Sequence, residues 1–249
     1  MKKIINLIVF SLLIVNANSQ KKIDSVESHS AIYDLFQYVE PYATIPKGEW
    51  EIHYRFEHLV YGSEKNSHPL PNQWGHRTGI EVALSKKLML EAFANFRQPE
   101  DHSEKNKLAN LSFSLRYRIV DHNKFFVDPA VIIEYKQGFS GGGSGVEGKL
   151  VLSKDIGRFN IVGNFGVESS GVEAGGSNKS GFELGSNFGI AYQFTNWLAI
   201  GGEYEHEFLG PTFGIRLKNL RINLSVGSSV EGQPSKYPAG RIGLVYRIK

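Results

Sequence analysis

The sequence predicts an all-β fold: a transmembrane, antiparallel, up-and-down β-barrel of about twelve strands, of the outer-membrane type. Three observations lead to this prediction. The N-terminus has the form of an export signal, apolar and polar residues alternate along residues 49–249, and every second connection between the alternating segments is short.

The first nineteen residues have the composition of a secretory signal. Met1-Lys2-Lys3 is basic, residues 4–15 are almost entirely apolar, and Ala17-Asn18-Ser19 supplies small residues for cleavage. The apolar run is too short for a membrane-spanning helix, which needs about 20 residues. We therefore expect a signal peptide over 1–19 and export of the mature chain.

Residues 20–48 are predicted to form a periplasmic leader that precedes the barrel. Ile32, Leu35, Phe36 and Val39 recur with helical spacing, and Pro41 ends the pattern. One interpretation is a short helix that plugs the periplasmic mouth of the barrel. The other is a docked or loose leader, and the sequence leaves both interpretations open.

The barrel is predicted over residues 49–249, where segments of strand length alternate strictly. In the last segment Ile242, Leu244 and Tyr246 share one face, and Arg241 and Arg247 lie on the other. In the sixth segment polar residues share a face with Val151, so its pattern is the weakest. The expected strands are 49–60, 74–84, 88–97, 108–120, 125–136, 146–154, 159–168, 181–194, 197–208, 211–217, 220–227 and 239–249.

The composition of the two faces indicates which one is outside. The apolar face carries large aromatic residues at both strand ends, whereas the polar face mixes full charges with many of the 27 glycines. A soluble sandwich or a lipocalin-like barrel would also alternate, but its charged outer face would rarely be so rich in glycine. An apolar face turned to lipid and a polar face turned to the lumen are typical of outer-membrane barrels.

The connections are sorted by length, which a soluble β-protein has no reason to do. Short turns at one end and long loops at the other are typical of periplasmic turns and extracellular loops, and an even strand count places both termini in the periplasm. Only the short Leu209–Gly210 connection departs from the rule. The short connections are 85–87, 121–124, 155–158, 195–196 and 218–219, and the long ones are 61–73, 98–107, 137–145, 169–180 and 228–238.

The polar face carries the candidate functional residues, which form a network of charges in the lumen. A turn at Leu209–Gly210 would place Glu203 opposite Arg216, and the turn at 218–219 would place Arg216 opposite Arg221. Such charges either form a constriction that selects solutes or form salt bridges that fill a narrow barrel and make it rigid. The residues assigned to this network are Glu203, Arg216, Arg221, Glu205, Glu207, Arg55, Glu57, Arg116 and Arg118.

The composition argues against several other functions. The absence of cysteine removes thiolate catalysis and thiolate metal sites, and a net charge of +3 provides no basic field for nucleic acid. His53 lies on the luminal face, but no motif ties Ser112 or Ser114 to a histidine, and the histidine spacings fit no metal-ligand pattern. We expect no catalytic residue, no metal site and no cofactor.

Several short motifs resemble a known family. Pro46-Lys-Gly-Glu-Trp-Glu51 opens the barrel, Leu150-Val-Leu-Ser-Lys-Asp-Ile-Gly-Arg-Phe-Asn160 follows a glycine-rich loop, and Asn164-Phe-Gly-Val-Glu168 continues it. Over about residues 44–249 this pattern resembles the outer-membrane transporter family named for the MetA pathway of phenol degradation. The resemblance implies a twelve-stranded barrel that lets small apolar or aromatic molecules pass, and it assigns no site residue.

The sequence as a whole predicts a monomeric barrel in lipid of the cell outer membrane. We expect it to act as a narrow passive channel or uptake protein for small solutes, without nucleic-acid partners. One alternative is a closed structural or surface-binding barrel whose loops bind ligands or phage. A second alternative is a lipid-modifying outer-membrane enzyme.

The predicted orientation can be tested on intact cells. An epitope tag in Asn66–His68 or in Asn178–Ser180 should be accessible to antibody, because both positions fall in long connections. A tag at Lys218–Asn219 should not be accessible, because this connection is short. Labelling of the Lys218–Asn219 tag alone would mean that the barrel is inverted.

Overall fold

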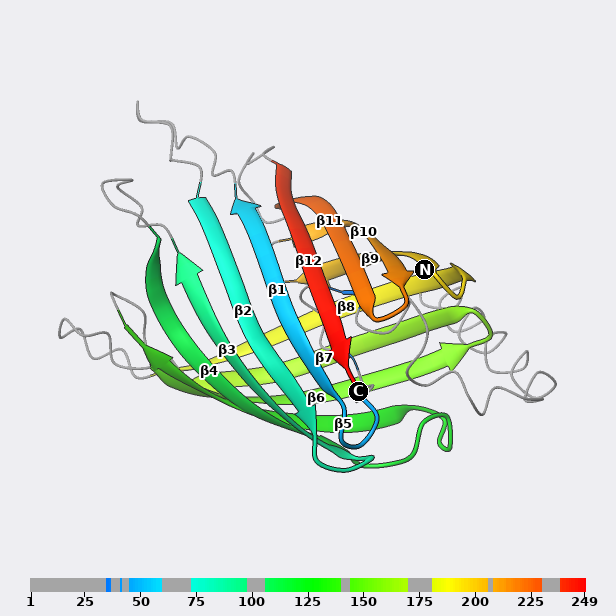
Figure 1. Cartoon of the computed structure of the whole chain (residues 1–249). Helices are drawn as coiled ribbons and strands as arrows, with labels where there is room; N and C mark the ends of the chain where they lie inside the picture. The colour runs from blue at the N-terminus through cyan, green and yellow to red at the C-terminus, as the bar shows by residue number, and fades with distance from the viewer. Residues whose placement is uncertain are drawn as a thin grey trace, which may run out of the picture.

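The barrel is complete in the computed structural model, which describes residues 35–36, 41, 45–59, 73–97, 106–139, 144–169, 181–205, 208–229 and 238–249. Twelve strands form one closed barrel, and every strand is antiparallel to both neighbours (Figure 1). This confirms the predicted fold class. The strands are β1 Trp50–Leu59, β2 Gln73–Ala83, β3 Leu88–Arg97, β4 Lys107–Arg118, β5 Asp128–Gly138, β6 Gly145–Ile156, β7 Phe159–Ser169, β8 Phe182–Thr195, β9 Leu198–Glu205, β10 Phe208–Leu217, β11 Leu220–Ser229 and β12 Pro238–Ile248.

The barrel closes where the first strand pairs with the last. The register of β1 and β12 runs from Trp50 opposite Ile248 to His58 opposite Gly240, so β1 is paired on both sides along most of its length. In Figure 1 β12 ends at the same end of the barrel at which β1 begins. Closure removes the free sheet edge, and a free edge would leave backbone N–H and C=O groups without partners in lipid.

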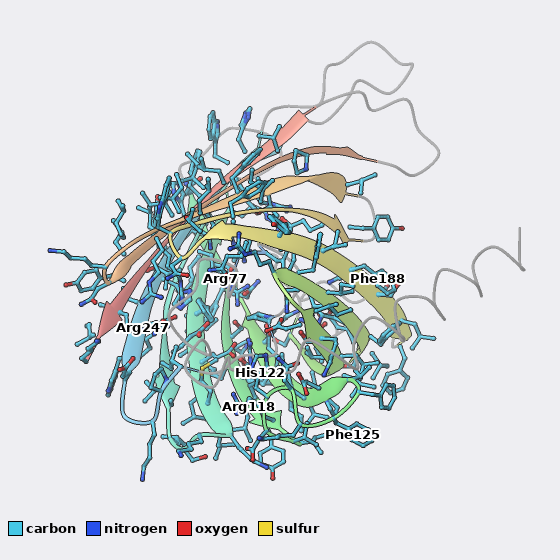
Figure 2. The ribbon with its side chains drawn as sticks, turned by 90° about the vertical axis from the view of Figure 1, so that its right-hand side faces the viewer. Arg77, Arg118, His122, Phe125, Phe188 and Arg247 are labelled. Carbon is cyan, nitrogen blue, oxygen red and sulfur yellow. The ribbon has the colours of Figure 1, made fainter. Side chains whose placement is uncertain are left out.

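The two faces of the barrel have opposite polarity, as the alternation predicted. Ile242, Leu244 and Tyr246 project outward and are exposed, whereas Arg241 and Arg247, which alternate with them on β12, project inward and are buried. Figure 2 shows Phe125 and Phe188 on the outside of the barrel and Arg77, Arg118 and His122 toward its interior. An apolar exterior of this extent would be costly in water and suits a lipid environment.

Aromatic side chains cluster on the outer surface near strand ends. On β1 and β2 the His58 and Trp74 rings lie 4.0 Å apart and the Phe56 and Trp74 rings 5.0 Å apart, and the Tyr54 hydroxyl lies 2.7 Å from Nδ1 of His76. His58 and His76 therefore face outward. Clusters of this kind form the interfacial aromatic belts of membrane barrels.

The predicted strand boundary at Leu209–Gly210 is wrong. β10 begins at Phe208 and continues through Gly210, which lies opposite Glu203 of β9. Glycine is required at position 210 for a reason other than a turn. A Cβ added there would lie 2.1 Å from the carbonyl oxygen of Val226 on β11. Gly210 thus allows a close approach of two backbones inside the sheet, which is a known role of strand glycines.

The leader is only partly described. Leu35 and Phe36, two of the four residues with helical spacing, are buried, whereas most of the predicted helix lies outside the described residues. The described part of the chain contains no helix with the length and hydropathy needed to cross a bilayer.

A closed barrel in detergent should resist unfolding by sodium dodecyl sulfate until it is heated. We expect the unboiled protein to migrate faster on a gel than the boiled protein, because the compact barrel persists until heat breaks the continuous strand pairing. Recovery of a soluble, detergent-free monomer from the periplasm would contradict the membrane-barrel account.

Candidate functional site

The predicted site residues lie on the luminal face wherever the structure describes their side chains. Strand alternation places Arg55, Glu57, Arg116, Arg118, Glu203, Arg216 and Arg221 on the inward side of β1, β4, β9, β10 and β11. Glu205 is the last residue of β9, and its side chain lies outside the described part of the structure. Glu207 lies outside the described residues. The strongest described cluster centres on a luminal residue that was not assigned to the predicted site.

Glu51 is the centre of the strongest described charge cluster. Its side chain is 1% exposed. Arg221 of β11 donates from Nη2 to Glu51 Oε2 at 2.5 Å, and Arg247 of β12 donates from Nε to Oε1 at 2.6 Å. Oε2 of Glu49 lies 3.7 Å from Nε of Arg247. The cluster therefore ties β1 to the two strands that close the barrel against it.

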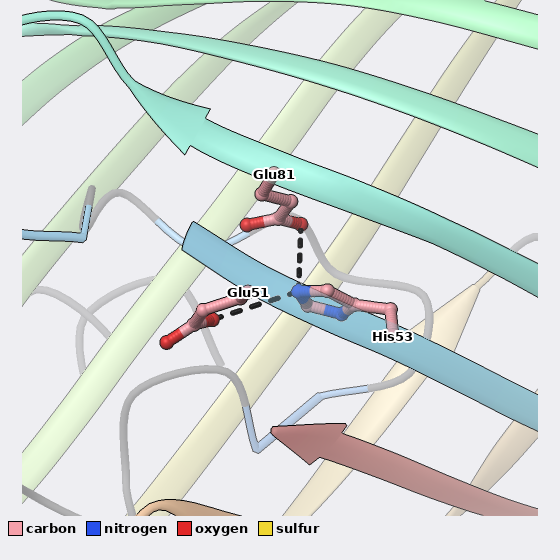
Figure 3. Close-up of side chains that lie close together, drawn as sticks. All are labelled: Glu51, His53 and Glu81. Carbon is pink, nitrogen blue, oxygen red and sulfur yellow. Dashed lines mark ion pairs between the residues drawn. The ribbon is translucent and has the colours of Figure 1, made fainter. Parts of the chain in front are cut away.

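His53 and Glu81 extend this cluster toward β2 (Figure 3). Nε2 of His53 lies 3.5 Å from Glu51 and 3.4 Å from Glu81. Ligand atoms of the three residues lie within 4.8 Å of one another, which is a spacing that could hold a metal ion. However, Arg221 and Arg247 already neutralise Glu51, and a cation would meet their positive charges at close range. We interpret the group as an ion-pair cluster.

The predicted partner of Arg216 is wrong. Arg216 does lie opposite Arg221, as the short turn at 218–219 predicted. Glu203 lies opposite Gly210, not opposite Arg216, because β9 and β10 are joined further toward the N-terminus than expected. The carboxylate beside the arginine pair is Glu51, which approaches from β1.

Glu91 of β3 and Arg116 of β4 form a second cluster. Arg116 is buried and pairs with Glu91 at 2.8 Å, and the Ser114 hydroxyl donates to the other oxygen of Glu91 at 2.8 Å. Arg116 also donates from Nη1 to the carbonyl oxygen of Pro41 at 2.5 Å. Two adjacent strands and the leader thus share one buried guanidinium.

Lys136 of β5 is the centre of a third cluster. It pairs with Glu147 of β6 at 3.2 Å and with Glu168 of β7 at 2.9 Å, and Lys149 reaches Glu147 at 3.1 Å. Glu147 and Lys149 belong to the sixth strand, whose pattern is the weakest. None of the four residues was assigned to the predicted site.

Arg55 and Arg77 lie directly opposite each other on β1 and β2. The guanidinium carbon of Arg77 lies 4.0 Å from the centre of the Phe93 ring, a cation–π contact that stabilises the charge. Guanidinium groups on the luminal face of neighbouring strands can bind acidic groups of a solute. The two residues are therefore candidates for a role in solute contact.

The luminal charges are distributed unevenly around the barrel. On β1–β4 and β10–β12 the described basic residues exceed the acidic ones, and on β5–β9 the acidic residues exceed the basic ones. The first group is Arg55, Arg77, Arg116, Arg118, Arg216, Arg221, Arg241 and Arg247 against Glu51, Glu57, Glu81 and Glu91, and the second is Asp128, Glu134, Glu147, Asp155, Glu168, Glu183 and Glu203 against Lys136 and Lys149. Two walls of opposite sign thus face each other across the lumen.

Comparison with solved structures identifies porins of similar fold. The KdgM porin superposes with a TM-score of 0.57 at 13% identity, covering 80% of this chain and 99% of the porin. The same porin in complex with disordered oligogalacturonate gives a TM-score of 0.55 at 13% identity, with the same coverage. At this identity the likeness establishes the barrel fold. No family model matches the sequence, and no curated protein matches it.

Neutralising Glu51 should destabilise the barrel. Glu51→Gln would leave Arg221 and Arg247 buried next to each other, and loss of one partner from a buried ion pair costs ~3–5 kcal/mol. We expect the gel transition from folded to unfolded form to occur at a markedly lower temperature. Glu183→Gln is the matched control, since Glu183 is exposed on β8. Equal transition temperatures for both variants would contradict the central role of Glu51.

Proposed function

We propose that the protein is a passive outer-membrane channel for small polar solutes. The observation that carries this proposal is the inversion of the two faces: a closed barrel exposes apolar side chains outward and lines its interior with charge. Such a barrel places a polar route inside an apolar wall. The fold shared with porins supports the proposal. The proposal also includes a signal peptide over residues 1–19, a barrel that is embedded in lipid, and a monomeric state.

We propose further that the solutes carry acidic groups. Arginines bind carboxylates well because the planar guanidinium can donate two parallel hydrogen bonds. The wall formed by β1–β4 and β10–β12 presents several of them to the lumen. The structural neighbour described with oligogalacturonate, an acidic sugar chain, supports this class by analogy. A charged lumen favours polar solutes over the apolar molecules that the MetA-pathway resemblance implies.

A closed structural barrel is the second candidate. It is favoured by the dense pairing of luminal charges, in which the Glu51, Arg116 and Lys136 clusters each cross-link two or more strands. Interior ion pairs of this kind stiffen a barrel. Single-channel recordings of the refolded protein distinguish the candidates, because a closed barrel gives no current.

The arginine pair should set the ion preference of the channel. Arg55→Gln together with Arg77→Gln removes positive charge from the lumen, so the relative permeability should shift toward cations. The measurement is the reversal potential in a salt gradient across a planar bilayer. Lys218→Gln is the control, because it removes one positive charge at an exposed turn between β10 and β11.

An unchanged reversal potential in the arginine double variant would contradict solute contact by this pair. A shift of the same size in Lys218→Gln would show that the measurement responds to charge outside the lumen.

A further inference from the structure

The largest described apolar cluster of the interior lines one part of the lumen wall. On strands β5–β9 a continuous group of small and branched apolar residues faces the lumen, and we call this group the apolar socket. These residues are buried in one cluster with Leu35 and Phe36 of the leader. The apolar socket consists of Ala130, Ile132, Val151, Val162, Ala191 and Ala199.

Leu35 and Phe36 occupy this socket from inside the barrel. Leu35 is 0% exposed and Phe36 is 7% exposed. The Thr212 hydroxyl of β10 donates to the carbonyl oxygen of Leu35 at 3.2 Å. A Cβ added to Gly189 of β8 would lie 2.7 Å from two atoms of the Phe36 ring, so the ring packs directly against the glycine backbone.

Later residues of the leader contact strands β2, β3 and β4. Pro41 accepts a hydrogen bond from Arg116 of β4, and Ile45 is buried in a cluster with Ala83 of β2 and Met89 of β3. Strands β4 and β10 are six positions apart in a closed ring of twelve, so they lie on opposite sides of the barrel. The hydrogen bonds to Leu35 and Pro41 therefore come from strands on opposite sides of the barrel.

We propose that Leu35 and Phe36 form an internal constriction by filling the apolar socket, and that this constriction limits passage through the lumen. The proposal rests on the proposed channel function and adds to it the element that narrows the path. Its physical basis is that apolar surface on both partners is removed from water only while the two residues are seated. Removal of the Phe36 ring should therefore release this part of the leader from the apolar socket.

Glycine variants of β8 provide the sharpest test of the constriction. Gly189→Ala places a methyl group where the Phe36 ring lies and should displace the ring. Gly185→Ala is the matched control, because it lies on the same face of the same strand and its added Cβ meets no atom within 4 Å. The added methyl group by itself would narrow the lumen and lower the conductance. A single-channel conductance that rises in Gly189→Ala and does not rise in Gly185→Ala would therefore support the constriction.

Removal of the aromatic ring tests the same point from the leader. Phe36→Ala should raise the conductance, whereas Phe165→Ala, which removes an exposed outward-facing ring from β7, should not. Conductance unchanged from wild type in both Phe36→Ala and Gly189→Ala would overturn the proposal.

Thiol labelling measures occupancy of the socket without any current. The chain contains no cysteine, so Ala191→Cys introduces a single thiol within the socket. We expect slow reaction with a small water-soluble maleimide, and reaction faster by ~10-fold or more when Phe36→Ala is added, because local opening exposes the thiol. Equally fast labelling in both proteins would overturn the proposal. If Phe36→Ala speeds the labelling of the Ala191→Cys thiol but no variant conducts current, Leu35 and Phe36 occupy the socket. That result would contradict the channel function.

Discussion

Complete pairing of the backbone is the constraint on which this structure depends. In lipid an unpaired N–H or C=O group has no water to bind, so the sheet must close. Closure brings β1 against β12, and their register places Glu51 between Arg221 and Arg247. The same seam therefore satisfies the backbone and contains the strongest described charge cluster. Because side chains alternate along every strand, closure also determines which residues line the lumen.

The local features of the fold were predictable from the sequence because short-range patterns determine them. Alternation identified the strands and their inward faces, and the two-residue turn at 218–219 correctly placed Arg216 opposite Arg221. The partner of Glu51 was not predictable in this way, since no turn sets the register between the first and the last strand. The Leu209–Gly210 pair was misleading because glycine is common in turns, whereas Gly210 serves a close approach to β11.

The interior combines two kinds of surface with different consequences. Charged residues cross-link neighbouring strands and leave a basic wall opposite an acidic one, which suits polar solutes. The apolar socket interrupts the acidic wall and is filled by Leu35 and Phe36. The socket also explains the mixed pattern of β6, where Val151 shares the luminal face with Glu147 and Lys149: Val151 packs in the socket, while the two charged residues belong to the Lys136 cluster.

A disulfide across the closing seam tests this account most directly. The cysteine-free chain permits a variant with Ile52→Cys and Tyr246→Cys, two outward-facing residues that lie directly opposite each other. Direct cross-strand neighbours fall within disulfide range, whereas diagonal neighbours are about 7–8 Å apart. The account predicts rapid disulfide formation in this variant and little in the diagonal variant with Ile52→Cys and Leu244→Cys. A disulfide only in the diagonal variant would mean a different register, and none in either would contradict closure between β1 and β12.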